Sequence, residues 1–227
     1  MRLLLLVFCC LAGIAALATP TTLIWIPSTD VQPYQVLHFD ADMLLYTNGG
    51  ATGAEADLGF LYGALPRLEL GIDFVNNFFN AEGTSTNPIW FNGKVQIIGT
   101  NTSTFALSAG VENVAVQAPA NAEMWYGVAS YRFGKVRVTG GGYSGLRSVL
   151  GSDHTGFLFG LEYVPNNPKW WYATDYQSGR NPFGTWNIGT AYHFTDKISY
   201  IIGMDFYNAP EIVGAKSSIT GQLDVDF

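Results

Sequence analysis

The chain has 227 residues, 13% of them charged, and a formal net charge of −7 at pH 7. Ordinary soluble domains carry about 25% charged residues, and the acidic balance argues against nucleic acid and anionic lipid head groups as main partners. After residue 18 no stretch is apolar enough for a membrane helix, whereas 26 glycines and 15% aromatic residues are typical of a transmembrane β-barrel.

The first 18 residues predict a secretory signal peptide. Met1-Arg2 is a short basic start, Leu3–Ile14 is an apolar run, and Ala16-Leu17-Ala18 is a cleavage site of the A-x-A type. The apolar run is too short to span a bilayer. Both cysteines, Cys9 and Cys10, lie in this segment, so we expect the mature chain to form no disulfide.

Residues 19–33 do not follow the pattern of the rest of the chain. They contain the apolar block Leu23–Ile26, followed by Pro27 and Pro33, and prolines interrupt the hydrogen-bond ladder of a sheet. We interpret the segment as a periplasmic lead-in that folds against or into the lower mouth of a barrel. A disordered tail is the alternative, since chain termini often fray.

From Tyr34 to Phe227 apolar and polar residues alternate with a period of two, which predicts β-strands with one apolar face. The segments are about ten residues long, the length of a tilted membrane strand, and they predict one all-β domain: a transmembrane, antiparallel, up-and-down β-barrel of about 12 strands. Only residues 123–133 are ambiguous, because apolar residues fall on both phases. The clearest segments are 37–45, 54–62, 67–74, 91–97, 104–112, 156–163, 170–177, 186–194, 199–206 and 218–227.

The links between these segments alternate in length. Short links at 63–66, 99–103, 134–135, 165–168 and 195–196 alternate with longer ones at 47–53, 80–88, 117–121, 145–153, 178–182 and 208–215. Outer-membrane barrels have short periplasmic turns and longer outer loops, so this order supports the barrel. A secreted β-sandwich would show the same alternation of faces, but it would not require so few charges or so many aromatic residues.

The last strand carries a further signal. Ile219, Gly221, Leu223, Val225 and Phe227 alternate with polar residues. A C-terminal amphipathic strand that ends in phenylalanine resembles the sorting signal of Gram-negative outer-membrane β-barrel proteins. The resemblance, to porin-like barrels with no subfamily identified, implies a place in the cell outer membrane and recognition of Phe227 by the barrel-assembly machinery. It also implies outer-membrane lipids and periplasmic chaperones as partners.

The polar phase of the strands predicts which charged residues face the lumen. Twelve acids and three bases fall on it, and a water-filled lumen with that excess favours cations over anions. The acidic excess also argues against a channel for acidic sugars. The candidates are Asp40, Asp42, Glu55, Asp57, Glu69, Asp73, Lys94, Glu112, Arg132, Arg137, Glu162, Asp175, Asp205, Asp224 and Asp226.

These patterns favour a narrow passive channel for small neutral or cationic solutes, with no cofactor, no metal and no enzymatic activity. One alternative is a plugged, structural barrel, with an interior filled by Tyr34, Tyr46, Trp171 and Tyr207. The less favoured alternative is a lipid-modifying enzyme, because His38, His154 and His193 have no serine motif. We expect the tryptophans near strand ends to form interfacial girdles: Trp90, Trp125, Trp170, Trp171 and Trp186.

Overall fold

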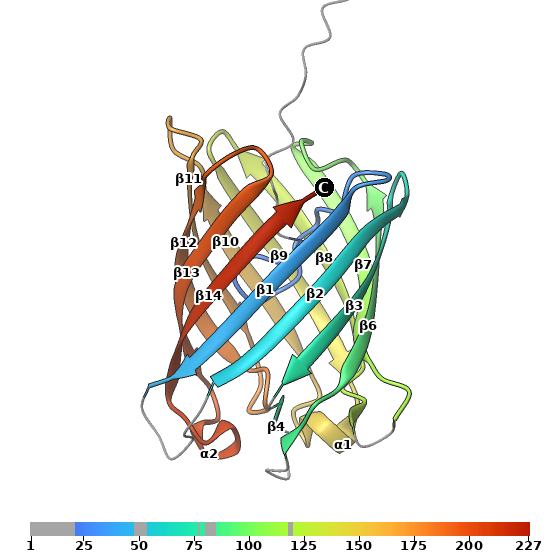
Figure 1. Ribbon diagram of the computed structural model, residues 1–227, viewed down its shortest axis with the longest axis vertical. Helices are drawn as coiled ribbons and strands as arrows, with labels where there is room; N and C mark the ends of the chain where they lie inside the picture. The colour runs from blue at the N-terminus through green and yellow to red at the C-terminus, as the bar shows by residue number, and fades with distance from the viewer. Residues whose placement is uncertain (1–20, 48–53, 77, 80–84, 118–119) are drawn as a thin grey trace, which may run out of the picture.

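The computed structural model describes residues 21–47, 54–76, 78–79, 85–117 and 120–227. Within these residues, twelve antiparallel strands form a closed barrel, and β1 pairs with β14 to close it (Figure 1). The predicted 12-stranded up-and-down barrel is therefore confirmed. The strands are β1 (Leu37–Tyr46), β2 (Ala54–Leu65), β3 (Leu68–Asn76), β6 (Ile89–Ile98), β7 (Phe105–Val114), β8 (Met124–Phe133), β9 (Val136–Gly145), β10 (Thr155–Tyr163), β11 (Trp170–Gln177), β12 (Thr185–His193), β13 (Ile198–Tyr207) and β14 (Ser217–Asp226).

The outer surface of the barrel is apolar because successive side chains of a strand point to opposite faces. Leu70 on β3, Phe159 on β10 and Ile202 on β13 are each about half exposed, and Phe39 contacts the exposed ring of Phe60 in a tilted arrangement. Lipid supplies no hydrogen bonds, so a spanning sheet must satisfy its backbone within a closed ladder. An apolar outside and a closed ladder together meet that requirement.

The two ends of the barrel differ, as the link lengths predict. Tight turns and the C-terminus lie at one end, and the links that contain α1 (Arg147–Leu150), α2 (Pro210–Val213) and β4 (Phe78–Phe79) lie at the other (Figure 1). β4 pairs with β5 (Ser85–Thr86) as a small separate hairpin between β3 and β6. No helix within the described ranges is long and apolar enough to cross a membrane.

The sequence does not decide which side chains of β8 point inward, but the register of the strand in the sheet does. β8 pairs with β7 and β9 so that Met124, Tyr126 and Val128 point inward and are buried, whereas Trp125 is 58% exposed on the outside. Both phases of this strand are apolar because its inner face packs against other apolar side chains. The interior of the barrel therefore contains an apolar cluster as well as polar groups.

A segment that precedes β1, residues 21–32, lies inside the barrel. Residues Thr21–Gln32, here called the inner hairpin, are almost all buried. The segment turns back on itself: the Leu23 amide donates to the Ile26 carbonyl (2.8 Å), and the Ser28 amide donates to the Thr21 carbonyl (2.9 Å). The predicted signal peptide, residues 1–18, is outside the described residues, as are residues 19 and 20 of the predicted lead-in.

The chain leaves the lumen beside β2, at the end with the tight turns. There the Gln35 amide donates to the Gly63 carbonyl, and the Gly63 amide donates to the Val36 carbonyl. A Cβ atom at Gly63 would lie 1.9 Å from the Pro33 carbonyl oxygen. Only glycine permits this close approach of two backbones.

Candidate functional site in the barrel lumen

One side of the lumen is lined by carboxylates. We call them the acidic wall: Asp40 and Asp42 on β1, Glu55 and Asp57 on β2, Glu69 and Asp73 on β3, Glu112 on β7 and Asp224 on β14. These eight side chains border a single cavity of ≈ 200 Å³, which the inner hairpin borders on its other side.

The strand register explains why the carboxylates lie close together. Asp40 lies opposite Asp224 on one neighbouring strand and opposite Gly59 on the other, and Gly59 in turn lies opposite Asp73. The Asp40 carboxylate rests over Gly59, where a Cβ atom would be only 2.4 Å from its oxygens. A glycine thus provides the space for one acid in a row that crosses four strands.

The next inward pair toward the loop end is made of two acids directly opposite each other, Asp42 on β1 and Asp57 on β2. One oxygen of each carboxylate, Oδ1, is buried without a hydrogen-bond partner among the described residues. Like charges placed directly opposite on neighbouring strands repel. This part of the wall therefore carries a negative field that no neighbouring base compensates.

Among the residues that the structure describes, basic groups approach the acidic wall only near the tight-turn end. The His38 ring lies between Asp226 (Nδ1 to Oδ1, 2.8 Å) and Asp224 (Nε2 to Oδ1, 3.5 Å). Lys94 lies 3.5 Å from Glu69 and donates to the Thr21 carbonyl at 2.6 Å. The field in the cavity is consequently more negative toward the loops than toward the turns.

The opposite side of the lumen, from β8 to β13, is packed; we call it the packed half. Its apolar side chains form one buried cluster with Leu23, Ile24 and Ile26 of the inner hairpin. Small wall residues make room for the hairpin tip: a Cβ atom at Gly160 would lie 2.3 Å from the Leu23 side chain. The cluster on this side includes Met124, Val128, Leu158, Ala173, Ala191 and Ile201.

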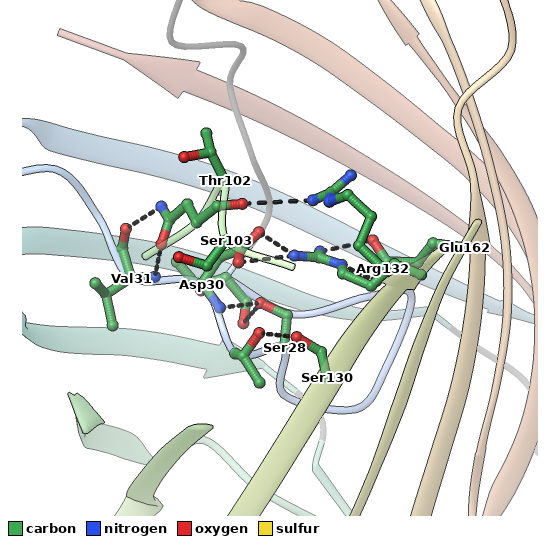
Figure 2. Close-up of polar contacts among 12 residues, drawn as sticks. Ser28, Asp30, Val31, Thr102, Ser103, Ser130, Arg132 and Glu162 are labelled. Atoms are coloured by element: carbon green, nitrogen blue, oxygen red, sulfur yellow. Dashed lines mark hydrogen bonds and ion pairs between the residues drawn. The ribbon is translucent and has the colours of Figure 1, made fainter. Parts of the chain in front are cut away.

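Arg137 is the central charge of the packed half. Its Nη1 lies 2.7 Å from both carboxylate oxygens of Asp30 in the hairpin, and its Nε and Nη2 donate to the two oxygens of Glu162 at 2.6 and 2.7 Å (Figure 2). Trp171 also donates its indole N–H to Glu162. A planar guanidinium suits such paired contacts, which are among the strongest hydrogen bonds in proteins.

Asp175 holds the tip of the hairpin. Its Oδ2 accepts the backbone amides of Ile24 (2.8 Å) and Trp25 (2.9 Å) and a longer one from Ile26 (3.4 Å). The turn leaves these amides without backbone partners, and converging amides form a favourable site for a negative charge. Gln222 on β14 donates to the Ile24 carbonyl at 2.8 Å.

The returning leg of the hairpin is fixed by side chains of five wall elements. The Thr29 carbonyl accepts from Gln96 (2.9 Å) and Ser108 (2.6 Å). The Thr29 hydroxyl lies 2.7 Å from that of Ser130, which is labelled in Figure 2. Asn101, in a tight turn, exchanges two hydrogen bonds with Val31. The Gln32 amide donates to Glu69.

The lumen candidates separate into three groups in the structure. Asp40, Asp42, Glu55, Asp57, Glu69, Asp73, Lys94, Glu112 and Asp224 border the cavity. Arg137, Glu162 and Asp175 hold the hairpin, whereas the Arg132 side chain makes a long contact (3.4 Å) with the Asn101 carbonyl. Asp205 accepts from Ser218 near the loops, where Ser218 also contacts Tyr207, and Asp226 pairs with His38.

Two tryptophans are not in the girdle position that the sequence suggested. Trp90 and Trp171 are only 4% and 8% exposed and point into the lumen, so that prediction was wrong for them. The Trp90 indole N–H donates to the Ala120 carbonyl, and that of Trp171 donates to Glu162. Partners inside the barrel for the indole N–H groups favour the inward position of Trp90 and Trp171. The other three tryptophans, Trp125, Trp170 and Trp186, are exposed on the outer surface.

Asp30 is an important lumen residue to which the sequence pattern does not point. It lies before the barrel, outside the strand pattern that selected the other candidates, yet it forms a buried ion pair with Arg137. The nearby apolar block Leu23–Ile26 was a signal that the segment is buried, but no periodicity linked Asp30 to a partner.

The three histidines lie in different places: His38 and His193 are buried inside the barrel, and His154 lies in a loop.

The sequence matches no protein-family model and no curated protein. Solved structures do match. The KdgM porin superposes with a TM-score of 0.57 at 10% identity over 85% of this chain and 99% of that one. A structure titled KdgM porin in complex with disordered oligogalacturonate gives the same values. The NanC porin gives 0.56 at 13% identity, over 83% and 98% of the two chains.

At these identities the likeness concerns the fold. The chain has the fold of a porin-like outer-membrane β-barrel. The inner hairpin and the acidic wall are features of this chain's own residues, and they carry the functional argument that follows.

Proposed function

We propose that the protein is a narrow channel for small neutral or cationic solutes, with a path that follows the acidic wall past the inner hairpin. The observation that carries the proposal is the cavity itself: among the described residues that line it, eight are carboxylates and two, His38 and Lys94, are basic. A negative wall in a confined space concentrates cations and excludes anions. Weak, distributed contacts of this kind also let a solute leave, as conduction requires.

The solved structures with this fold support a transport role, because they are described as porins. One of them is described as a complex with oligogalacturonate, an acidic ligand. The acidic wall of the present chain would repel such a ligand, so we propose a different solute class. Among the described residues, the charges that face the cavity are the feature that determines which class of solute can pass.

A structural barrel without transport is the second candidate, and the inner hairpin favours it. The hairpin occupies much of the lumen, and Trp171 and Tyr207 are buried inside as a filled interior requires. Tyr46 is half-buried, but Tyr34 is 51% exposed and does not fill the interior. A structural barrel does not need the cavity beside the acidic wall, so this second candidate does not explain why the cavity is there.

Single-channel recording of the refolded protein in a planar bilayer, under a salt gradient, separates the two candidates. A channel gives current steps with a reversal potential on the cation-selective side. The double variant Asp40→Asn with Asp73→Asn should shift that potential toward zero. The matched control, Asp196→Asn with Glu211→Gln, removes two exposed charges outside the cavity and should leave the potential almost unchanged. A silent bilayer with folded protein supports the structural barrel.

Export and assembly complete the proposal. We propose that residues 1–18 direct the chain across the inner membrane and that Phe227 is read by the barrel-assembly machinery, with periplasmic chaperones in between. The motifs quoted from the sequence support both steps. The Phe227 side chain is 66% exposed, so its interior packing does not account for a phenylalanine there.

A further inference from the structure

The inner hairpin is attached to the barrel through side chains and not through strand pairing. It does not join the ladder of any barrel strand; its bridge Thr22–Pro27 is internal, and the bridge from Tyr34 to Gly63 lies after it. Its polar attachments are hydrogen bonds to wall side chains and one ion-pair cluster at Asp30. Removing the hairpin would therefore leave the strand pairing of the barrel intact.

The wall groups that hold the hairpin are polar. Arg137, Glu162, Asp175, Ser130 and Gln96 can each bind water in place of a hairpin group, because water can enter the space that the hairpin vacates. The apolar tip, Leu23–Ile26, has the opposite requirement, since it is buried against the packed half only while docked. The docked state is consequently favoured, and a displaced state would be a minor one.

The hairpin also borders the cavity. Thr21, Thr22, Ile24, Trp25 and Pro27 form the side of the cavity that faces the acidic wall. Displacing the hairpin would add its own volume to a space of ≈ 200 Å³. A twelve-stranded barrel is intermediate between small filled barrels and open porins, so a segment of this size decides how wide the passage is.

We propose that the inner hairpin is a gate: docked, it narrows the passage, and displaced, it opens the passage along the acidic wall. The inference rests on the channel function proposed above and adds its regulation. The latch has two parts, the ion-pair cluster of Asp30 with Arg137 and the amide-bound carboxylate of Asp175. The apolar tip supplies the preference for the docked state.

The structure offers a reversible lock for this gate. The hydroxyl oxygens of Thr29 in the hairpin and Ser130 in β8 are 2.7 Å apart, so cysteines at both positions would be close enough for a disulfide. The double variant Thr29→Cys with Ser130→Cys would pin the hairpin to the wall. The mature chain expected from the sequence has no other cysteine, and the variant would be expressed without residues 1–18 and refolded.

A matched control lies at the loop end of the barrel. The hydroxyls of Thr47 and Ser217 are 2.8 Å apart, and cysteines there would join the ends of β1 and β14 without touching the hairpin. A second variant, Leu23→Ser with Ile26→Ser, weakens the apolar tip while leaving every wall residue unchanged. Folding of each variant is checked by circular dichroism before recording.

The readout is the time-averaged single-channel current with oxidised and reduced protein. We expect the oxidised Thr29–Ser130 disulfide to lower it at least tenfold and dithiothreitol to restore it, with no change in the control pair. The tip variant should raise it at least threefold over the parent. Current that is indifferent to the lock would overturn the gate and leave a channel with a fixed constriction. Silence in all variants, the tip variant included, would overturn both the gate and the channel.

Discussion

The packed half and the acidic wall differ in whether their charged side chains have partners within the protein. In the packed half, Arg137 contacts two carboxylates and Asp175 accepts three backbone amides. On the acidic wall, Asp42 and Asp57 face each other with one oxygen each left without a partner among the described residues. Where the hairpin fills the lumen, charges must be paired within the protein; beside the cavity, Asp42 and Asp57 are only half-buried, so part of each side chain keeps contact with water.

The inward phase of the strands differs between the two sides, whereas the outward phase is apolar on both. β1 turns Asp40 and Asp42 toward the cavity, but β8 and β13 turn Met124, Val128 and Ile201 into the buried cluster. The inner hairpin matches this division, because it packs its apolar tip against β8–β13 and lines the cavity with its other side. The comparison teaches that the inward residues of the strands and a segment from outside the sheet together divide the lumen into two environments.

The largest effect should come from removing the central charge of the packed half. Arg137→Met leaves Asp30 and Glu162 buried without their cation, and breaking a buried pair typically costs about 3–5 kcal/mol. We expect a loss of that size in the free energy of unfolding, measured by urea titration in lipid vesicles with tryptophan fluorescence. The control is Arg132→Met, which removes a half-buried arginine whose contact with a carbonyl is long. Equal losses for the two arginines would break the comparison.

The second prediction tests whether the two sides differ only on the inside. Leu70 lies on β3 beside the acidic wall, and Phe159 lies on β10 in the packed half, but both point outward. An arginine near the bilayer midplane of a barrel costs about 2–4 kcal/mol. We expect Leu70→Arg and Phe159→Arg to lower the free energy of unfolding in vesicles by similar amounts within this range. If Leu70→Arg is as stable as the parent, the assigned outward face of β3 is wrong.

The third prediction uses one kind of substitution on both sides. Asp175→Asn removes a charged acceptor of three amides and should lower the free energy of unfolding by about 1.5–3 kcal/mol. Asp57→Asn removes repulsion from Asp42 and should raise it by up to about 1 kcal/mol. The gain, but not the loss, should shrink in 1 M salt, because ions screen charges that water reaches. Urea titrations at two salt concentrations measure both, and changes of the same sign would contradict the comparison.

The smallest effect on stability is expected at Phe227. Its amide donates to the Leu37 carbonyl beside the acidic wall, but its side chain is 66% exposed. Deletion should change the free energy of unfolding of the refolded barrel by less than about 0.5 kcal/mol, as for most surface changes. The amount of protein in the outer membrane of cells should nevertheless fall markedly. Normal outer-membrane levels after deletion would refute the proposed assembly role, and Phe227→Ala provides a length-matched control.

The barrel itself follows from the sequence. A spanning strand must alternate its faces and close its ladder, and both demands leave a period of two and a regular series of links. Those local signals were enough to predict twelve strands, the end at which the short turns gather, and an outward position for Leu70, Phe159 and Ile202. They also identified the acids that border the cavity, because the inward phase is a property of each strand by itself.

Only the tertiary structure decided what the inward residues do. Asp30 and Arg137 are 107 residues apart, and nothing local to either specifies the pair. Trp90 and Trp171 point inward, where the Ala120 carbonyl and the Glu162 carboxylate accept their indole N–H groups; Ala120 is 30 residues from Trp90, and Glu162 lies on the strand next to that of Trp171. Alternation records which face a side chain is on, but not which side chains from other segments meet it, since those contacts depend on where the inner hairpin docks.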